Sequence, residues 1–524
     1  MGGRRARASR RRRRRRRNHG TDRISGLPDE LLHEILFRLP STADAARTSL
    51  LSRRWRGVWA HVPAISLTDG DQAPGASILD AVDAAVAANA APALDRLAIS
   101  LEDDWYSQRR GEPDLAARIA PWLRFASRRL AGELSLQLFQ PRRPGKIDIN
   151  SVPQTTVKVP VCDRATAIDV NVVHLGIKLK FRASGGGTFL ALRVLKITGS
   201  FRLHERSLER AVSSQCPRLQ ELTLCNNHDT CRKLTIRSDS LERLNLGLRV
   251  RVITVQTPRL VRLKMASLFD LDRLQSRRAH IAAPNLTEMT WYNTYDPQHN
   301  RIVDAPRHLQ RLKVRLYCLR SALPVAALFE RFDTVDELDL RVRIPRLFGV
   351  LPSFMRHQEG KFECKAFMKE TAKLPQCKVL KLSIYPEGLQ EYSIVVLHLL
   401  RGCANARKVV LYLDLHGEKV SDYYSSLVMK KEQGRSACGN RLTTDGPVLD
   451  SLEELELNFY RLGDPEVDLV NQLLLSCGAA LKTVVIRPLW GFTSKLSSAK
   501  LETVAGFCGP ETTIEFHGCR LIGR

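Results

Sequence analysis

The sequence has 524 residues, of which 44% are hydrophobic and 26% charged, and its formal net charge is +27. This is the composition of folded globular domains rather than of a disordered chain, and the length allows for two to four domains. No run of about 18 uncharged apolar residues occurs, so we expect no membrane-spanning segment.

The positive charge is densest at the start of the chain. Residues 1–17 hold eleven arginines and no acidic residue, which leaves a net charge of about +16 for the other residues. Because like charges repel, we expect residues 1–21 to be a disordered tail. This tail is a candidate nuclear-localisation signal or a nonspecific nucleic-acid-binding arm, and a leader without a function is an equal alternative. The candidate signal is the unbroken run Arg10, Arg11, Arg12, Arg13, Arg14, Arg15, Arg16 and Arg17.

The segment from Leu27 to Trp59 predicts three short amphipathic helices. Pro28 suits the start of the first helix, because the N–H that proline lacks has no acceptor there. The apolar residues of this helix, predicted over residues 29–38, recur at one-, three- and four-residue steps and give it a broad apolar side. They are Leu31, Leu32, Ile35, Leu36 and Leu39.

Two further helices come after the helix break at Pro40. Ser41 and Asp44 have the spacing of an N-terminal capping box, and Ser52 can cap the third helix, which places Trp55 and Trp59 on one face. These three helices carry more apolar residues than so small a unit can bury alone. The surplus indicates a binding partner, and an N-terminal cap on a larger core is the alternative.

The order of these residues resembles the F-box of plant F-box proteins. The resemblance is carried by Leu27-Pro28-Asp29-Glu30-Leu31-Leu32, Ile35-Leu36, Leu39-Pro40, Ala45-Ala46-Arg47-Thr48-Ser49, Leu51-Ser52-Arg53-Arg54-Trp55 and Trp59. It implies that residues 22–67 dock onto the Skp adaptor of SCF ubiquitin ligases, and through the adaptor reach the cullin. The adaptor-binding residues that we expect on this basis are Leu27, Pro28, Leu31, Leu32, Ile35, Leu36, Leu39, Pro40, Leu50 and Trp55.

After a linker at residues 68–77, one short pattern returns along the chain: an apolar residue, two of any kind, an apolar residue, one of any kind, and an apolar residue. In the central part its starting positions are 27, 22, 19, 26 and 23 residues apart, at or near the period of leucine-rich repeats. The pattern occurs at Leu94/Leu97/Ile99, Leu192/Leu195/Ile197, Leu219/Leu222/Leu224, Leu241/Leu244/Leu246, Leu260/Leu263/Met265, Leu286/Met289/Trp291, Leu309/Leu312/Val314, Val335/Leu338/Leu340, Val379/Leu382/Ile384, Leu452/Leu455/Leu457 and Leu481/Val484/Ile486.

This spacing predicts an α/β fold. The last two apolar residues of each unit belong to a strand with alternate residues inward, and one unit cannot cover its own apolar edge. The units therefore stack into a solenoid with parallel strands on one face and helices or turns on the other. We expect an irregular leucine-rich-repeat solenoid over residues 78–524, after the three-helix F-box.

The repeats resemble the leucine-rich and FBD-type regions of plant F-box proteins, the latter in the C-terminal part. Phrases of that style are Cys216-Pro217-Arg218-Leu219-Gln220-Glu221-Leu222, Ser238-Asp239-Ser240-Leu241-Glu242-Arg243-Leu244 and Leu452-Glu453-Glu454-Leu455-Glu456-Leu457. Residues 341–376 and 415–447 interrupt the rhythm. They are either loops that project to a binding surface or disordered excursions.

The sequence shows no set of residues typical of a catalytic, cofactor or metal site. His33-Glu34 begins like a zinc-protease motif, but Phe37 stands where the second histidine ligand is needed. The twelve cysteines include no C-x-x-C pair, which argues against a zinc site or a disulfide framework. We therefore expect a protein without cofactor and without a catalytic role of its own.

Together these features predict the substrate-recognition subunit of an SCF-type ubiquitin ligase, working in the nucleus or the cytoplasm. The F-box would bind the adaptor and the repeats would bind a protein target of unknown identity. Two alternatives stay open: a nuclear protein bound to nucleic acid or chromatin through its basic tail, and an F-box scaffold outside ubiquitin transfer.

Overall fold

The computed structural model describes most of the chain after the arginine-rich tail. The described residues are 26–71, 77–101, 115–139, 155–181, 187–266, 278–292, 295–317, 325–344, 364–386, 392–413, 449–459, 464–488 and 512–516. Within them no helix is both long and apolar enough to cross a membrane.

Helices form the start of the described chain and also cover parts of the strand-rich region beyond it. The α-helices are α1 (Asp29–Phe37), α2 (Thr42–Arg47), α3 (Trp55–Val58), α4 (Ile78–Ala88), α5 (Leu115–Arg129), α6 (Glu205–Arg210), α7 (Ala326–Arg331), α8 (Cys364–Glu370), α9 (Tyr392–Gly402) and α10 (Asp464–Leu475). Short helical turns are η1 (Thr48–Leu50), η2 (Trp59–His61), η3 (Asp69–Asp71) and η4 (Ala211–Gln215).

Strands begin within the segment expected for the F-box and recur to the end of the described chain. They are β1 (Ala64–Thr68), β2 (Leu94–Leu101), β3 (Leu130–Phe139), β4 (Thr155–Val159), β5 (Ala167–Phe181), β6 (Val194–Leu203), β7 (Glu221–Arg237), β8 (Arg243–Gln256), β9 (Arg262–Met265), β10 (Arg278–Ala282), β11 (Glu288–Trp291), β12 (Asn300–Val303), β13 (His308–Tyr317), β14 (Thr334–Ile344), β15 (Gln376–Pro386), β16 (Lys408–Leu413), β17 (Glu454–Phe459), β18 (Thr483–Pro488) and β19 (Thr513–Phe516).

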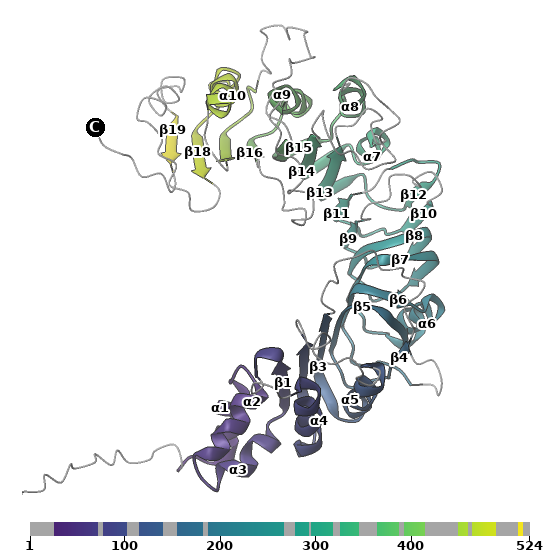
Figure 1. Cartoon of the computed structure of the whole chain (residues 1–524). Coiled ribbons are helices and arrows are strands. Elements are labelled where there is room, and N and C mark those ends of the chain that lie inside the picture. Colours follow the sequence, from purple (N-terminus) through teal and green to yellow (C-terminus); the bar gives the residue numbers. More distant parts are fainter. Residues whose placement is uncertain are drawn as a thin grey trace, which may run out of the picture.

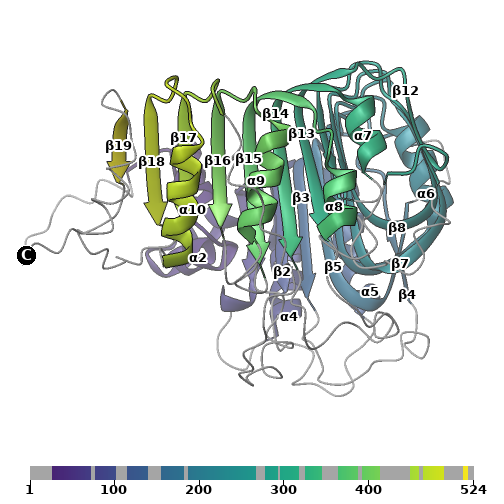
Figure 2. The same cartoon turned by 90° about the horizontal axis from the view of Figure 1, so that it is seen from above.

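The chain forms a crescent with the three N-terminal helices at one tip, and parallel strands line its concave side (Figure 1). The concave ladder passes through β1, β2, β3, β5, β6, β7, β8, β9, β11 and then β13 to β19 in order. Seen from above, β13 to β18 lie side by side with α7, α8, α9 and α10 on their outer side (Figure 2). The predicted solenoid with parallel strands is confirmed.

Each of the eleven predicted repeat patterns lies at a concave strand, but in β15 the predicted Val379, Leu382 and Ile384 are two residues out of register, because Cys377, Leu380 and Leu382 pair with Val335, Leu338 and Leu340 of β14. In β7, by contrast, Leu222 and Leu224 are buried and pair in register with Leu244 and Leu246 of β8. Leu219, the first residue of that pattern, lies just before the strand and is also fully buried. One apolar core runs between the concave strands and the outer face from Ile65 to Ile486.

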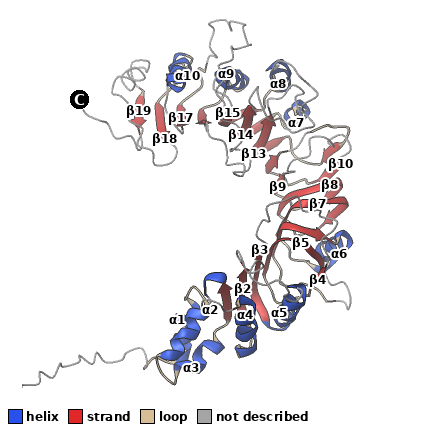
Figure 3. Cartoon of the chain, in the orientation of Figure 1, coloured by secondary structure: helices blue, strands red, loops and turns tan. Residues whose placement is uncertain are grey.

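The outer face of the middle of the crescent is built from strands, which differs from the expected helices or turns. The long strands β7 and β8 bend after their concave part and pair again, Lys233 with Val252 and Arg237 with Gln256. This outer half of β8 pairs with β10, and β10 with β12, while β4 pairs with the outer half of β5. Helices cover the outer face toward both ends instead (Figure 3).

The sheet also begins earlier than expected, because β1 pairs with β2 along its whole length, from Ala64 with Arg96 to Thr68 with Ser100. Residues 64–67 therefore belong to the first strand of the solenoid as well as to the end of the segment predicted as F-box. Further bonds join the two parts: Ala90 N–H donates to the Ala60 oxygen at 2.7 Å and Ser66 N–H to Thr42 Oγ1 at 2.7 Å.

Candidate functional site

The three N-terminal helices enclose a small core of their own, separate from the core of the repeats. Its buried members are Leu32, Leu36, Ala45, Trp55, Val58 and Val62. Leu27, Phe37, Leu39, Trp59 and Ala64 pack against it and are partly buried. The predicted placement of Trp55 and Trp59 on the same side of the third helical segment is thus confirmed.

Caps and ion pairs hold these short helices together. Ser41 Oγ accepts a hydrogen bond from the Asp44 N–H at 3.1 Å, which confirms the predicted N-cap of α2. Arg54 ties the start of α3 to the start of α1, since its guanidinium contacts Asp29 Oδ1 at 2.5 Å and the Leu27 oxygen at 2.6 Å. The expected cap by Ser52 is wrong: α3 begins after Arg54, and no side chain caps it.

The expected adaptor-binding residues divide into two groups in the structure. Leu32, Leu36 and Trp55 are at most 4% exposed, so they stabilise the helical unit from inside. Leu31 and Ile35, one turn apart on α1, are 48% and 42% exposed, and Leu50 is 89% exposed. Pro28 and Pro40 are exposed and Leu27 and Leu39 half-buried. Binding to an adaptor stays a prediction for all of them.

Leu51 is a further exposed apolar residue that the sequence reasoning did not select. Its side chain is 68% exposed, directly after η1 and beside Leu50 in the sequence. The helical period fails here because α2 ends at Arg47 and the chain continues as a tighter turn. The exposed apolar set of the helical unit is therefore Leu31, Ile35, Leu50 and Leu51.

These four side chains suit docking rather than chemistry. They are large, apolar and solvent-exposed on a unit whose core is complete without them, and this is typical of a protein-binding surface. Neighbouring polar residues, such as Arg38 paired with Glu34 at 3.4 Å, can form a polar rim around such a surface.

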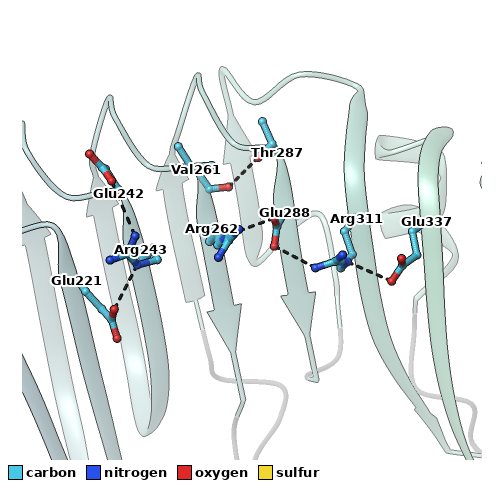
Figure 4. Close-up of polar contacts among 9 residues, drawn as sticks. All are labelled: Glu221, Glu242, Arg243, Val261, Arg262, Thr287, Glu288, Arg311 and Glu337. Atoms are coloured by element: carbon cyan, nitrogen blue, oxygen red, sulfur yellow. Dashed lines mark hydrogen bonds and ion pairs between the residues drawn. The ribbon is translucent and has the colours of Figure 1, made fainter.

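The concave face of the repeats carries a second ordered set of side chains, a ladder of ion pairs. Arg262 contacts Glu288 at 3.1 Å, Glu288 contacts Arg311 at 3.5 Å, and Arg311 contacts Glu337 at 3.1 Å (Figure 4). Glu337 also pairs with Lys381 at 3.0 Å, and Glu221 pairs with Arg243 at 3.2 Å. Because the strands are parallel and in register, side chains of opposite charge at one position meet between β7 and β8 and from β9 through β11 and β13 to β14, whereas Arg243 and Arg262 are the register partners between β8 and β9.

The described residues include cysteines, several of them buried, and other side chains of the kinds that bind metal ions. No group of three or more His, Cys, Asp or Glu side chains that could hold a metal ion is found among them. Burial raises the pKa of the Cys162 and Cys216 thiols to about 12, so both stay protonated and act as core residues. The arginine run Arg10 to Arg17 lies outside the described residues, as do most of the two interrupting segments.

Comparisons with known proteins agree with this arrangement. Residues 24–64 match the F-box domain model, and residues 119–300 match the model described as "FBD-associated F-box protein At5g56370, LRR repeats". The F-box/FBD/LRR-repeat protein At5g56420 of Arabidopsis thaliana is 24% identical over 417 residues, which cover 74% of this chain and 91% of that protein.

Two other Arabidopsis thaliana relatives match shorter parts. The F-box/FBD/LRR-repeat protein At1g51370 is 28% identical over 44% of this chain and 47% of its own length. The F-box/LRR-repeat protein At5g02910 is 58% identical over 48 residues, which are 9% of this chain and 10% of that protein. The F-box and the repeats are each matched and each seen in the structure, so in both parts the chain is similar to plant F-box proteins with leucine-rich repeats.

Proposed function

We propose that this protein is the substrate-recognition subunit of an SCF-type ubiquitin ligase. Its F-box binds the Skp adaptor and through it the cullin, and its repeats bind a protein target. The observation that supports the proposal most directly is the exposure of Leu31 and Ile35 on an F-box whose own core is already filled by Leu32, Leu36 and Trp55.

The protein acts in this proposal by proximity and not by chemistry of its own. Binding a target and the ubiquitin-transfer machinery on one molecule raises the local concentration of target lysines beside the transferring enzyme. The bonds that join the F-box to β1 and β2 suit this role, because they fix the direction in which the repeats leave the adaptor.

The test is co-purification of the Skp adaptor with the double variant Leu31→Ala, Ile35→Ala. Truncating a central interface anchor typically costs about 2 kcal/mol or more, so losing two anchors should abolish co-purification. Leu190→Ala is the matched control, because Leu190 is 56% exposed but lies among the repeats. Full adaptor binding by a folded double variant would falsify the assignment of this surface.

A further arm separates a ligase subunit from an F-box scaffold. The wild-type chain is purified from cells with the proteasome blocked, and cullin and accumulated proteins are scored. A ligase subunit should retain cullin and enrich at least one bound target protein. The Leu31→Ala, Ile35→Ala variant should still bind that target but should no longer promote its degradation. Adaptor binding without cullin would support the scaffold instead.

A further inference from the structure

The outer strands in the middle of the crescent carry a dense set of cations, which we call the outer cationic face. It lies on the second halves of β7 and β8 and on β10 and β12, on the convex side of the crescent (Figure 1). Its cations are all exposed: Arg232, Lys233, Arg237, Arg251, Arg278 and Arg301, and the exposed His280 lies among them.

Strand alternation turns Lys233, Arg237, Arg278, His280 and Arg301 outward, whereas Arg232 and Arg251 are exposed although they have the parity of the buried Leu234 and Ile253. Leu234, Ile236, Ile253, Val255 and Ile281 are buried against the core, so the residues between them face solvent. The register then places the outward residues in rows across the strands, about 4.8 Å apart. One row is Lys233, Val252 and Arg278, and the next is Thr235, Thr254, His280 and Arg301.

Acidic residues are missing from this face. The four strand segments 231–237, 249–256, 278–282 and 300–303 contain no aspartate and no glutamate. None of these six arginines and lysines makes a side-chain ion pair within the described parts of the chain. On the concave face, by contrast, cations are paired with acidic residues. Arg311, for example, contacts both Glu288 and Glu337.

Two carboxylates of α6 are bonded to the backbone of this face, and the other nearby carboxylates are paired or lie at its margin. Glu205 and Glu209 of α6 accept hydrogen bonds from the backbone N–H groups of Arg232 at 3.0 Å and Thr235 at 2.6 Å. Asp296 is bonded to His299 at 2.7 Å. Asp239 and Asp304 are exposed in the turns after β7 and β12, at the edge of the face.

The same composition recurs on the other side of α6. The outer strands there pair Thr156 with Lys178, Lys158 with Lys180, and Lys178 with Arg202, and these strand segments also lack acidic residues. Two neighbouring groups of outer strands thus carry cations and no acidic residues of their own, with Glu205 and Glu209 of α6 between them. Like charges at this density repel one another, so a bound polyanion would relieve a cost that the free protein carries.

We propose that the outer cationic face binds the phosphate backbone of double-stranded nucleic acid, without regard to base sequence. Lysine and arginine contact phosphates by charge, and the hydroxyls of Thr235 and Thr254 can donate to phosphate oxygens between them. A duplex carries one negative charge per about 1.7 Å of its axis, a density that matches closely spaced cations.

Two other polyanionic partners fit this face less well. A protein partner normally buries aromatic or large apolar anchors, and these strand segments hold no phenylalanine, tyrosine or tryptophan. An anionic membrane surface is usually bound with apolar side chains inserted beside the charges, and this face offers none larger than Val252 and Val303. Absent aromatics also disfavour single strands, whose bases stack on such rings.

The experiment measures binding of the full chain to a fluorescein-labelled 24-base-pair DNA duplex between about 50 and 200 mM salt. The test variant is Lys233→Gln, Arg278→Gln, Arg301→Gln. Each lost phosphate contact lowers the slope of log affinity against log salt by about 0.9, so we expect a slope smaller by about 2.7 and affinity at least about tenfold weaker.

The matched control removes the same charge elsewhere: Arg124→Gln, Arg128→Gln, Lys373→Gln. These three residues are exposed and lie near α5 and α8. The arginine-rich tail is present in every variant, so its contribution cancels. A second variant, Lys233→Arg, Arg278→Lys, Arg301→Lys, keeps the charges and should bind as wild type does.

Three results would overturn the proposal. The first is an equal salt slope for the test and control variants, both shown to be folded by thermal melting. The second is competition by polyglutamate as effective, per charge, as competition by unlabelled duplex, which would indicate an acidic protein segment. The third is retention on phosphatidylserine vesicles that depends on the three cations while duplex binding does not.

Discussion

The middle and the C-terminal part of the crescent bury the apolar side of the same sheet under different outer layers. Both cover the convex side of the sheet of concave strands, the middle with β4, β10, β12 and the outer halves of β5 to β8, and the C-terminal part with α7 to α10. Repeat length does not decide between the two, because α7 forms within the 26 residues from Leu309 to Val335, a spacing that also occurs in the middle. The period of the apolar residues in the return segment decides which element forms.

The two apolar periods are visible in single segments. Leu234 and Ile236 of β7 alternate with outward residues, as a strand requires. On α9 the buried residues Val395, Val396, Leu399 and Leu400 recur at steps of three and four, as a helix requires. The comparison teaches that one concave sheet can carry two kinds of outer layer without a break in its ladder.

The largest effect is expected where a strand passes from the inner to the outer layer in the middle region. Gly199 of β6 has φ +120°, and an added Cβ would lie 2.1 Å from the Val172 oxygen. Strained backbone and a steric clash each cost about 1–3 kcal/mol, so Gly199→Ala should destabilise the protein by about 2–6 kcal/mol.

Gly57→Ala is the control for this prediction, because nothing lies within 4 Å of its added Cβ. Chemical denaturation of both variants measures the difference. Similar stability for the two would mean that β6 does not bend at Gly199.

A core truncation comes next and tests the packing that the two regions share. Leu244 of β8 is 1% exposed, and Leu244→Ala should cost about 2–5 kcal/mol through the lost contacts and the cavity that remains. Asn245, the next residue, is half-buried on the concave side and should tolerate alanine within about 0.5 kcal/mol. Thermal melts of both variants decide, and equal effects would contradict the strand register.

The smallest effect concerns the ion pairs where the helical part begins. Lys313 of β13 and Asp339 of β14 form a pair whose side chains are 22% and 12% exposed. A double-mutant cycle with Lys313→Met and Asp339→Asn should give a coupling of about 1 kcal/mol, because the pair is largely shielded from water. The more exposed pair of Lys408 with Glu454 should couple by less than about 0.5 kcal/mol. Coupling of equal size would show that burial does not set the strength of this ladder.

The concave strands of this fold can be predicted from the sequence more completely than the outer strands and helices. The pattern at Leu219, Leu222 and Leu224 is easy to recognise because all three residues are leucines, and β7 lies where this pattern predicts a strand. The same pattern at Ala165, Ile168 and Val170 and at Ala406, Val409 and Leu411 is easily missed, because alanine and valine are weaker signals than leucine. The strand β3 does not show the pattern, because it contains one extra residue where its pairing with β2 shifts between Leu94 and Arg96.

The F-box is recognisable from residue order, but its exposed side chains cannot be read from that order alone. Leu31 and Leu32 are adjacent and equally apolar, yet one is 48% exposed and the other fully buried. The direction of each depends on how α1 packs against α3 and η2, which are short segments with little periodicity of their own. Packing of this kind is decided by contacts between segments and not within them.

The ladder of strands is continuous from β1 onward, so the position of each repeat relative to the F-box is set by the number of strands between them. Inserting or deleting one whole repeat would move everything beyond it by about one strand spacing, 4.8 Å, with a small added rotation. The distance and angle between the two ends can therefore change over evolution only in discrete steps. In related proteins with different repeat numbers, the distance from the F-box to the far half of the concave face should differ by whole multiples of one strand spacing.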